Sequence, residues 1–158
     1  MLTRADQTVV DALEVLDDIA PVGLTHIGFK DVGLPPAELA RVARRIREMG
    51  ATSYMEVVST TPAACLASAR VAREIGIERL LGGTQIDEVL AILDGSPTRY
   101  LPFPGRPFDH PTKLAGSPDD VERDCRRAIE RGCAGVDLLA YRATEADPLE
   151  LVQAARRG

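Results

Sequence analysis

Lys30 and Glu56 are the two side chains of this sequence best suited to act on a carbonyl compound, and each lies at or near the end of a short apolar segment. Lysine can exchange a proton or form a Schiff base with a carbonyl group, and a carboxylate beside it can exchange protons too. Lysine is also rare here, because 17 of the 19 basic residues are arginine and only Lys30 and Lys113 are lysine. Two interpretations stay open: a catalytic pair, and an ion pair that only satisfies two buried charges.

Alternation along the predicted strands indicates which other side chains share a face with this pair. Successive side chains of a strand point to opposite faces. In the segments 25–30, 53–58 and 136–141, apolar residues alternate with other residues, and we expect the apolar set to face a layer of helices. The residues on the opposite face then line one common mouth. Besides Lys30 and Glu56, this set contains Asp137. His26 lies deeper in its strand and is expected to be a core histidine.

The segment 104–113 is the longest predicted loop, and four prolines and two bulky aromatic residues in and beside it predict a stiff, ordered lid. Loops of this length in a compact domain are often functional. Arg106, His110 and Lys113 are suited to bind an anionic substrate, and His110 can also act as an acid or base. The alternative is a surface loop with incidental charges.

The candidates fall into two groups, both expected at the carboxyl ends of strands or in the loops that follow. The candidate catalytic residues are Lys30, Glu56, His110 and Asp137. The candidate substrate-binding residues are Arg4, Thr84, Arg106, Lys113 and Tyr141. Arg4 ends the predicted first strand, and Thr84 follows directly on the predicted fourth.

Carboxylates suited to Mg²⁺ are also present, at Asp31, Glu56, Asp109 and Asp137. Their spacing matches no diagnostic metal motif. The three cysteines, Cys65, Cys125 and Cys133, have no metal-ligand spacing either and are expected to be small buried hydrophobic residues. The sequence therefore predicts no metal and no other cofactor.

The elements that must position these residues are marked by glycines that each close a helix-like run. These glycines are Gly23, Gly50, Gly76, Gly95, Gly132 and Gly158. All but the last are followed by a short apolar segment, so the chain is predicted to be an α/β protein of parallel (βα) repeats in one domain, residues 1–158. The predicted strands are 1–4, 25–30, 53–58, 79–83, 99–103 and 136–141.

Parallel strands joined by helices form either a doubly wound sheet or a (βα)8 barrel. No glycine-rich GxGxxG or Walker-type loop follows the first predicted strand, and polar residues repeatedly end the strands, which favours the barrel. A complete barrel has about 250 residues. We therefore expect six units of a TIM (βα)8-type barrel, with the seventh and eighth strands missing.

Composition limits the partners. The chain has 158 residues and a net charge of −5, with no apolar run long enough to cross a bilayer and no signal-peptide pattern. We expect a cytoplasmic protein with neither a nucleic-acid nor a membrane partner. An open parallel sheet exposes its edge strands, here the first and the sixth, so we also expect a homo-oligomer that covers them.

The first 30 residues or so resemble the start of phosphoribosylanthranilate isomerase, in Leu2–Arg4, Asp11–Leu13 and Gly23–Phe29. That family belongs to the ribulose-phosphate-binding barrels, so the resemblance implies the barrel fold. The family's catalytic cysteine of the first strand has no counterpart, because no cysteine precedes Cys65. The family's phosphate-binding loops follow strands seven and eight, which are not predicted here. The resemblance therefore implies neither the isomerase activity nor any catalytic residue.

These observations lead to one functional hypothesis and one alternative. The hypothesis is a TIM-barrel-type lyase or isomerase that acts on a small anionic, phosphorylated carbonyl compound. The alternative is an inactive or binding-only partial barrel that functions through oligomeric assembly.

Overall fold

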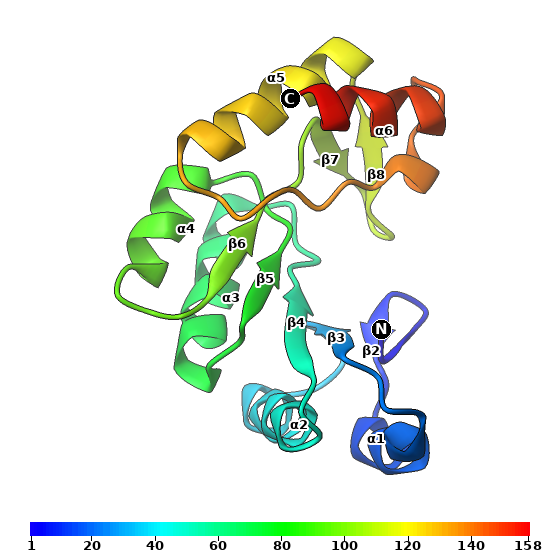
Figure 1. The fold of residues 1–158 in the computed structure, drawn as a ribbon, viewed down its shortest axis with the longest axis vertical. Helices are drawn as coiled ribbons and strands as arrows, with labels where there is room; N and C mark the ends of the chain where they lie inside the picture. Colours follow the sequence, from blue (N-terminus) through cyan, green and yellow to red (C-terminus); the bar gives the residue numbers. More distant parts are fainter.

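The computed structural model describes residues 1–158 and contains a four-stranded parallel sheet with helices between its strands (Figure 1). The strands follow one another in space as in sequence, in the order β3 (His26–Lys30), β4 (Thr52–Glu56), β5 (Arg79–Leu81) and β6 (Arg99–Leu101). They are joined by the helices α2 (Pro36–Glu48), α3 (Pro62–Ile75) and α4 (Ile86–Leu93). The α/β class is confirmed, and so are four of the six predicted strands.

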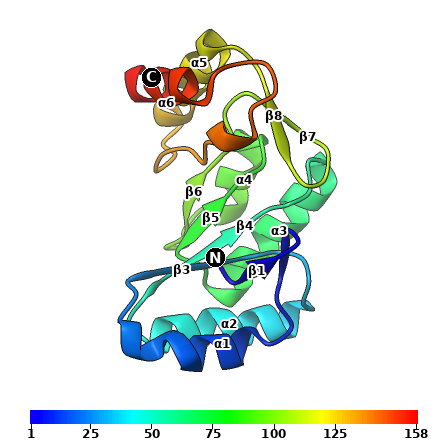
Figure 2. The same ribbon diagram turned by 90° about the vertical axis from the view of Figure 1, so that its right-hand side faces the viewer.

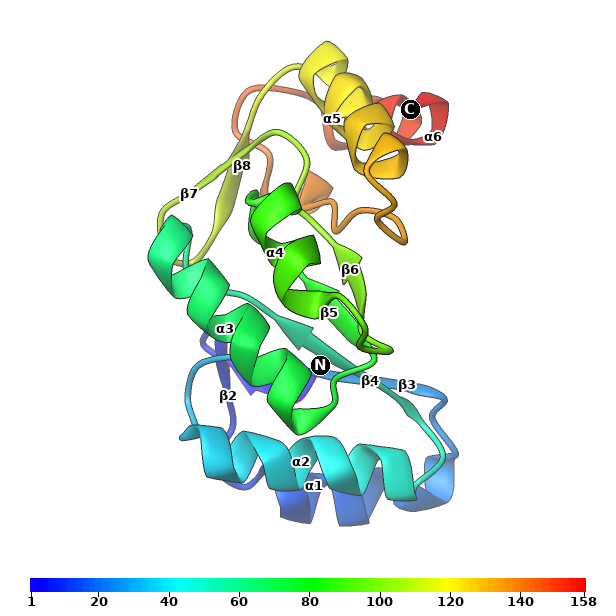
Figure 3. The ribbon, with the colours of Figure 1, turned by 90° about the vertical axis from the view of Figure 1, so that its left-hand side faces the viewer.

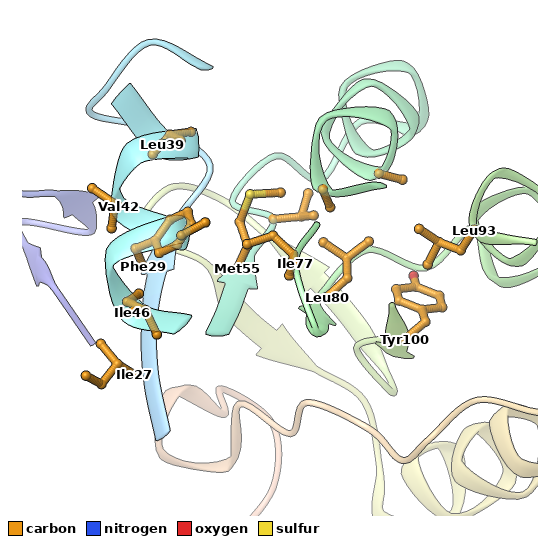
Figure 4. Packing of buried hydrophobic residues seen from close by; sticks show 14 of the residues in the cluster. Ile27, Phe29, Leu39, Val42, Ile46, Met55, Ile77, Leu80, Leu93 and Tyr100 are labelled. Carbon is orange, nitrogen blue, oxygen red and sulfur yellow. The ribbon is translucent and has the colours of Figure 1, made fainter. Parts of the chain in front are cut away.

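The three connecting helices cover one face of this sheet, as Figure 3 shows. The apolar side chains of alternate strand positions, such as Phe29, Met55 and Leu80, point into the layer between sheet and helices (Figure 4). Each is fully buried, and burial of a side chain of this size stabilises a fold by about 2 kcal/mol. The predicted alternation is therefore confirmed in β3 and β4. Helices on one face and strands in sequence order exclude a doubly wound sheet, whose strand order reverses.

The N-terminal segment was predicted to be a first parallel strand, and this is wrong. It forms a small antiparallel hairpin of β1 (Thr3–Arg4) and β2 (Gln7–Thr8), followed by α1 (Ala12–Ile19). The hairpin lies along β3, where the Leu2 amide donates to the Gly28 carbonyl at 2.7 Å. The Thr8 hydroxyl accepts from the Lys30 amide and donates to the Lys30 carbonyl. The side chain of Thr8 thus replaces a backbone partner at the edge of the sheet.

The predicted sixth strand, 136–141, is also wrong. The segment is irregular and ends in a 3₁₀ turn, η2 (Ala140–Arg142). It still runs beside β6, because the amides of Ala134 and Asp137 donate to the carbonyls of Tyr100 and Pro102, both at 2.9 Å. In a regular parallel ladder the second donor would be two residues after the first, not three. The extra residue beside Gly135, whose φ is 149°, breaks the ladder.

The predicted lid is an ordered hairpin of β7 (Arg106–Phe108) and β8 (Lys113–Ala115). It leads into α5 (Pro118–Glu130), which packs against α6 (Pro148–Arg157) around a second, smaller core. Both helices are capped at their N-termini: Ser117 and Asp120 form a capping box on α5, and the Asp147 carboxylate accepts from the first turn of α6. Figure 2 shows the two hairpins on the side of the sheet opposite α3 and α4.

The edges of the sheet are therefore not open. The N-terminal hairpin covers β3 and the segment after α5 covers β6, through the hydrogen bonds described above. This removes the reason for expecting a homo-oligomer. None of the helices combines the length and the apolar character that crossing a membrane requires.

Candidate functional site

A buried cluster of charged side chains lies at the carboxyl ends of β3 and β4. Lys30 and Glu56 occupy paired positions in the two strands, and Lys30 Nζ is 3.0 Å from Glu56 Oε1. The same Nζ is 2.6 Å from Oδ1 of Asp6, in the turn between β1 and β2. The side chains of Lys30, Asp6 and Glu56 are only 7%, 4% and 12% exposed. The predicted proximity of Lys30 and Glu56 is confirmed, while Asp6 was not predicted.

Asp6 links the cluster to two further segments. Its Oδ1 also accepts from Arg142 Nη2 at 3.1 Å, and its Oδ2 lies 3.9 Å from Nδ1 of His110. That Oδ2 is buried and has no hydrogen-bond partner. Burial would raise the pKa of Asp6, but the hydrogen bonds from Lys30 and Arg142 and their charges outweigh burial and lower this pKa below its usual 3.8. Asp6 is thus an ionised carboxylate with one free oxygen.

Asp137 adds a carboxyl group with different properties. Its backbone amide donates to the carbonyl of Pro102, directly after β6, and its Oδ2 is buried without a hydrogen-bond partner. Burial raises the pKa of Asp137 from 3.8 to about 7; the charge of Glu56 adds to this rise and that of Lys30 opposes it. A carboxyl group with this pKa both donates and accepts protons near neutral pH. Asp137 is therefore near enough to Lys30 and Glu56 to feel their charges, but it makes no ion pair or hydrogen bond with either.

His110 lies at the rim of the cluster, in the turn between β7 and β8, and its side chain is half-exposed. Beside it is a cavity of about 390 Å³. The other polar residues that line the cavity are Gln7, Ser59, Thr60 and Asp109. Of the predicted catalytic candidates, Lys30 and Glu56 thus belong to the cluster, His110 lies at its rim, and Asp137 lies within reach of the cluster's charges.

The predicted substrate-binding residues are not gathered at this site. Arg106 pairs with Glu145 and Asp120, and Lys113 pairs with Asp109 at 3.1 Å. Tyr141 is 96% exposed, and Arg4 is exposed beside an apolar pocket near the N-terminus. Thr84 lines a separate cavity of about 180 Å³ together with Arg127, at the carboxyl ends of β5 and β6. Only Thr84 therefore lies at a hollow of the surface on the same end of the sheet.

The expectation for His26 is wrong, because its side chain is exposed. It lies at the first residue of β3, where its ring contacts the Tyr54 ring edge-on and its Nδ1 is 3.2 Å from the Tyr54 hydroxyl. The position is on the face that the connecting helices leave open, and no other layer covers it there. The alternation pattern correctly predicted the face of the sheet on which His26 lies, but it did not predict that the side chain is exposed there.

The carboxylates considered for Mg²⁺ do not form a common site, and no group of three or more His, Cys, Asp or Glu side chains is arranged to hold a metal ion. Asp31 accepts from the Val58 amide and the Ser68 hydroxyl, and Asp109 pairs with Lys113. Two of the cysteines are buried as predicted, and Cys133 is partly buried. Burial raises the pKa of the Cys65 thiol to about 11, which makes it a poor nucleophile.

Sequence reasoning missed Asp6 and Arg142, which both contact the cluster. Arg142 is half-buried and also donates to the Thr112 carbonyl at 3.2 Å. The one local signal for Asp6 is its residue type, since aspartate is favoured in turns. Arg142 is 136 residues from Asp6 in the chain, and no local pattern connects residues at that separation.

Comparison with known proteins assigns no relative: no protein-family model matches the chain, and no curated protein sequence matches it.

Proposed function

We propose that this chain is a lyase or isomerase that moves a proton next to the carbonyl group of a small anionic compound. The observation that carries the proposal is the position of Lys30, buried between two carboxylates at the carboxyl ends of parallel strands and close enough to Asp137 for its charge to act on the pKa of that residue. In barrels of (βα) units, chemistry occurs at this end. Carboxyl groups whose pKa is strongly shifted, close to a buried cation, are also typical of sites that transfer protons.

The roles follow from the charges. Ionised Asp137 removes a proton from the carbon beside the carbonyl, and the electron pair of that C–H bond moves to the carbonyl oxygen and forms an enolate. The ammonium group of Lys30 stabilises this negative charge. If the deprotonated carbon carries a hydroxyl group, transfer of the hydroxyl proton to the former carbonyl oxygen and return of the first proton to the former carbonyl carbon give the isomeric carbonyl compound. If the enolate instead re-forms the carbonyl group and its electron pair expels a leaving group from the next carbon, the product is that of a lyase. Because two carboxylates hold Lys30, this electrostatic role is better supported than a Schiff base, which needs a free amine.

The wider fold proposed here is part of a ribulose-phosphate-binding type of (βα)8 barrel. Strand order equal to sequence order and connecting helices on one face support it. The N-terminal hairpin and the segment beside β6 flank the sheet where further barrel strands belong. The cavity with Thr84 and Arg127 is a candidate position for a phosphate on the substrate, because it lies at the carboxyl ends of β5 and β6 and is lined by an arginine, although Asp124 lines it too.

Exchange of carbon-bound hydrogen in ²H₂O tests the proton transfer without knowledge of the product. We expect the protein to exchange the α-hydrogen of at least one compound in a panel of small phosphorylated hydroxy-ketones and hydroxy-aldehydes, followed by NMR. Asp137→Asn and Lys30→Met are expected to lower the exchange rate at least about 100-fold, the usual contribution of a positioned acid or base. Arg106→Met, which removes only exposed ion pairs, is the matched control.

Exchange that is absent for every compound, or equal in Asp137→Asn and the unchanged protein, contradicts the proposal. A denaturation curve of each variant at the assay temperature separates lost chemistry from lost folding.

A binding-only protein is the second candidate, and the double ion pair of Lys30 favours it because the pair satisfies the lysine without any ligand. Saturable binding of a panel compound without hydrogen exchange distinguishes this function from catalysis.

A further inference from the structure

We propose that the cavity between the loop after β4 and the turn of the β7–β8 hairpin is a binding subsite for a neutral, polyhydroxylated, sugar-like group, with His110, oriented by Asp6, as its main hydrogen-bonding residue. The inference deepens the proposed function, and rests on it only in taking this group to be part of the substrate.

Three segments far apart in the chain build the cavity. Gln7 comes from the N-terminal hairpin, Ser59 and Thr60 follow β4, and Asp109 and His110 form the tip of the second hairpin. At about 390 Å³ the cavity is in the lower part of the size range of small-molecule sites. It lies beside the Lys30 cluster, because Gln7 directly follows Asp6 in the sequence. A group bound here is therefore next to the proposed reaction site.

The lining selects a neutral ligand over an anion. Val32 and Val58 form the apolar part of the lining, and the polar part comprises the Thr60 hydroxyl, an amide, an imidazole, the carboxylate of Asp109 and the Ser59 hydroxyl, which also bonds Thr61 at 3.0 Å. Together these groups can donate to and accept from hydroxyl groups of a ligand. The lining contains no arginine and no lysine, and the nearby Lys113 already pairs with Asp109 at 3.1 Å. A phosphate in this cavity would face the charge of Asp109, with that of Asp6 behind His110. A polyol meets no such repulsion.

The free oxygen of Asp6 is a separate observation that points to the same place. Oδ2 belongs to a side chain that is 4% exposed, has no hydrogen-bond partner, and is 3.9 Å from His110 Nδ1. This separation is about one ångström longer than a hydrogen bond. A small movement of the imidazole ring gives Oδ2 its missing donor and turns Nε2 of His110 toward a ligand in the cavity. Asp6 is thus a positioning residue for His110.

The backbone on both sides of this contact is strained in the same way. Asp6 has a φ of 63° and Asp109 a φ of 61°, which residues other than glycine rarely adopt. Each costs about 1 to 3 kcal/mol and persists where the surrounding structure fixes it, often at ligand sites. The two strained turns are those that bring Asp6 and His110 together.

The chain has only two histidines, so the ring signals of His110 and His26 can be followed separately by NMR. We expect ribitol, the probe, to shift the His110 signals in a saturable way and to leave those of exposed His26 unchanged. Ser59→Ala combined with Thr60→Val is expected to weaken ribitol binding about tenfold, since two hydrogen bonds are lost. Gln153→Ala, which removes an exposed side-chain amide on α6 far from the cavity, is the control.

The role of Asp6 has its own signature. In the ribitol complex the ¹⁵N signal of His110 Nδ1 is expected at the position of an N–H bonded to a carboxylate, and Asp6→Asn is expected to abolish that shift while the His26 signals stay those of the folded protein. If Asp6→Asn does not fold, the Ser59/Thr60 double variant still tests the subsite.

A His110 signal that ribitol does not move, or that inorganic phosphate moves and ribitol does not, overturns the proposal. Its failure is distinct from that of the proposed function, because ribitol binding needs no proton transfer, and hydrogen exchange by Asp137 needs no ribitol site.

Discussion

Replacing Asp137 by asparagine is expected to change how the stability of this fold depends on pH. The carboxyl group of Asp137 is buried, its Oδ2 has no hydrogen-bond partner, and its pKa is raised to about 7 by burial first and by Glu56 second. In the unfolded chain the same group has its usual pKa of 3.8. Between these two values the folded protein holds a proton that the unfolded chain has released. Stability is therefore lost as the pH rises through this window, and the loss is complete above pH 7.

The size of the effect follows from the shift. A difference of one pKa unit corresponds to 1.36 kcal/mol, so the rise from 3.8 to about 7 lowers the free energy of unfolding by about 4 kcal/mol at high pH. Asparagine cannot ionise and removes this loss. It also places N–H donors where the carboxyl oxygen has no partner, which costs about 1 to 3 kcal/mol at every pH. The pH-dependent part is thus separable from the constant part.

Urea denaturation of both proteins from pH 4 to pH 9 measures this difference. The stability of Asp137→Asn relative to the unchanged protein is expected to rise by up to about 1.4 kcal/mol per pH unit and to level off above pH 7. Groups that do not interact with Asp137 contribute equally to both curves and cancel. Two parallel curves would refute the raised pKa, and with it the role of Asp137 as an acid and base near neutral pH.

Two further substitutions test the backbone of the site. Ala5→Gly is expected to stabilise the fold by about 1 kcal/mol, because Ala5 has a φ of 49°. Ala40→Gly, inside α2, is expected to destabilise the fold by a similar amount. Equal effects of the two substitutions in urea denaturation would contradict the strained turn. Gly83→Ala is expected to lower the free energy of unfolding by about 2 to 4 kcal/mol, because Gly83 has a φ of 72° and an added Cβ would overlap Sγ of Cys65. Gly95→Ala, at a similar φ but with open space around the Cβ, is expected to lower it by about 1 kcal/mol. A melting curve of Gly83→Ala no lower than that of Gly95→Ala would show that the predicted overlap is absent.

The pairing of Lys30 with Glu56 could be predicted from sequence because it needs only local information. The apolar residues Ile27, Phe29 and Met55 fix which face of each strand meets the helices, and Lys30 and Glu56 alternate with them. Two consecutive parallel strands then place equivalent ends side by side. The same reasoning brought Asp137 to this end of the sheet even though its segment is not a strand, since it still runs beside β6.

The N-terminal hairpin could not be predicted in this way. A two-residue turn with positive φ at both central positions is favoured by Asn-Gly and similar pairs, and Ala5 is a poor residue for it. The hairpin is held by contacts far away in sequence: Thr8 bonds both backbone groups of Lys30, and Asp6 pairs with its side chain. Tertiary contacts therefore override the local preference, and a pattern read along the chain does not contain them.

The same cause explains why Asp6 escaped prediction and why it matters. The sheet supplies Lys30 and Glu56, which regular strands position at no cost in backbone strain. The residues that complete the site, Asp6 and His110, come from two hairpin turns, and each turn contains an aspartate with positive φ, Asp6 in one and Asp109 next to His110 in the other. Strain of this kind persists only where other contacts over-determine the conformation. Here the contact is the Asp6 carboxylate, which binds Lys30 with one oxygen and faces His110 with the other. The strained turns and the charged cluster therefore stabilise each other. Loss of the Lys30–Asp6 ion pair is thus expected to change the position of the His110 side chain as well as that of Lys30.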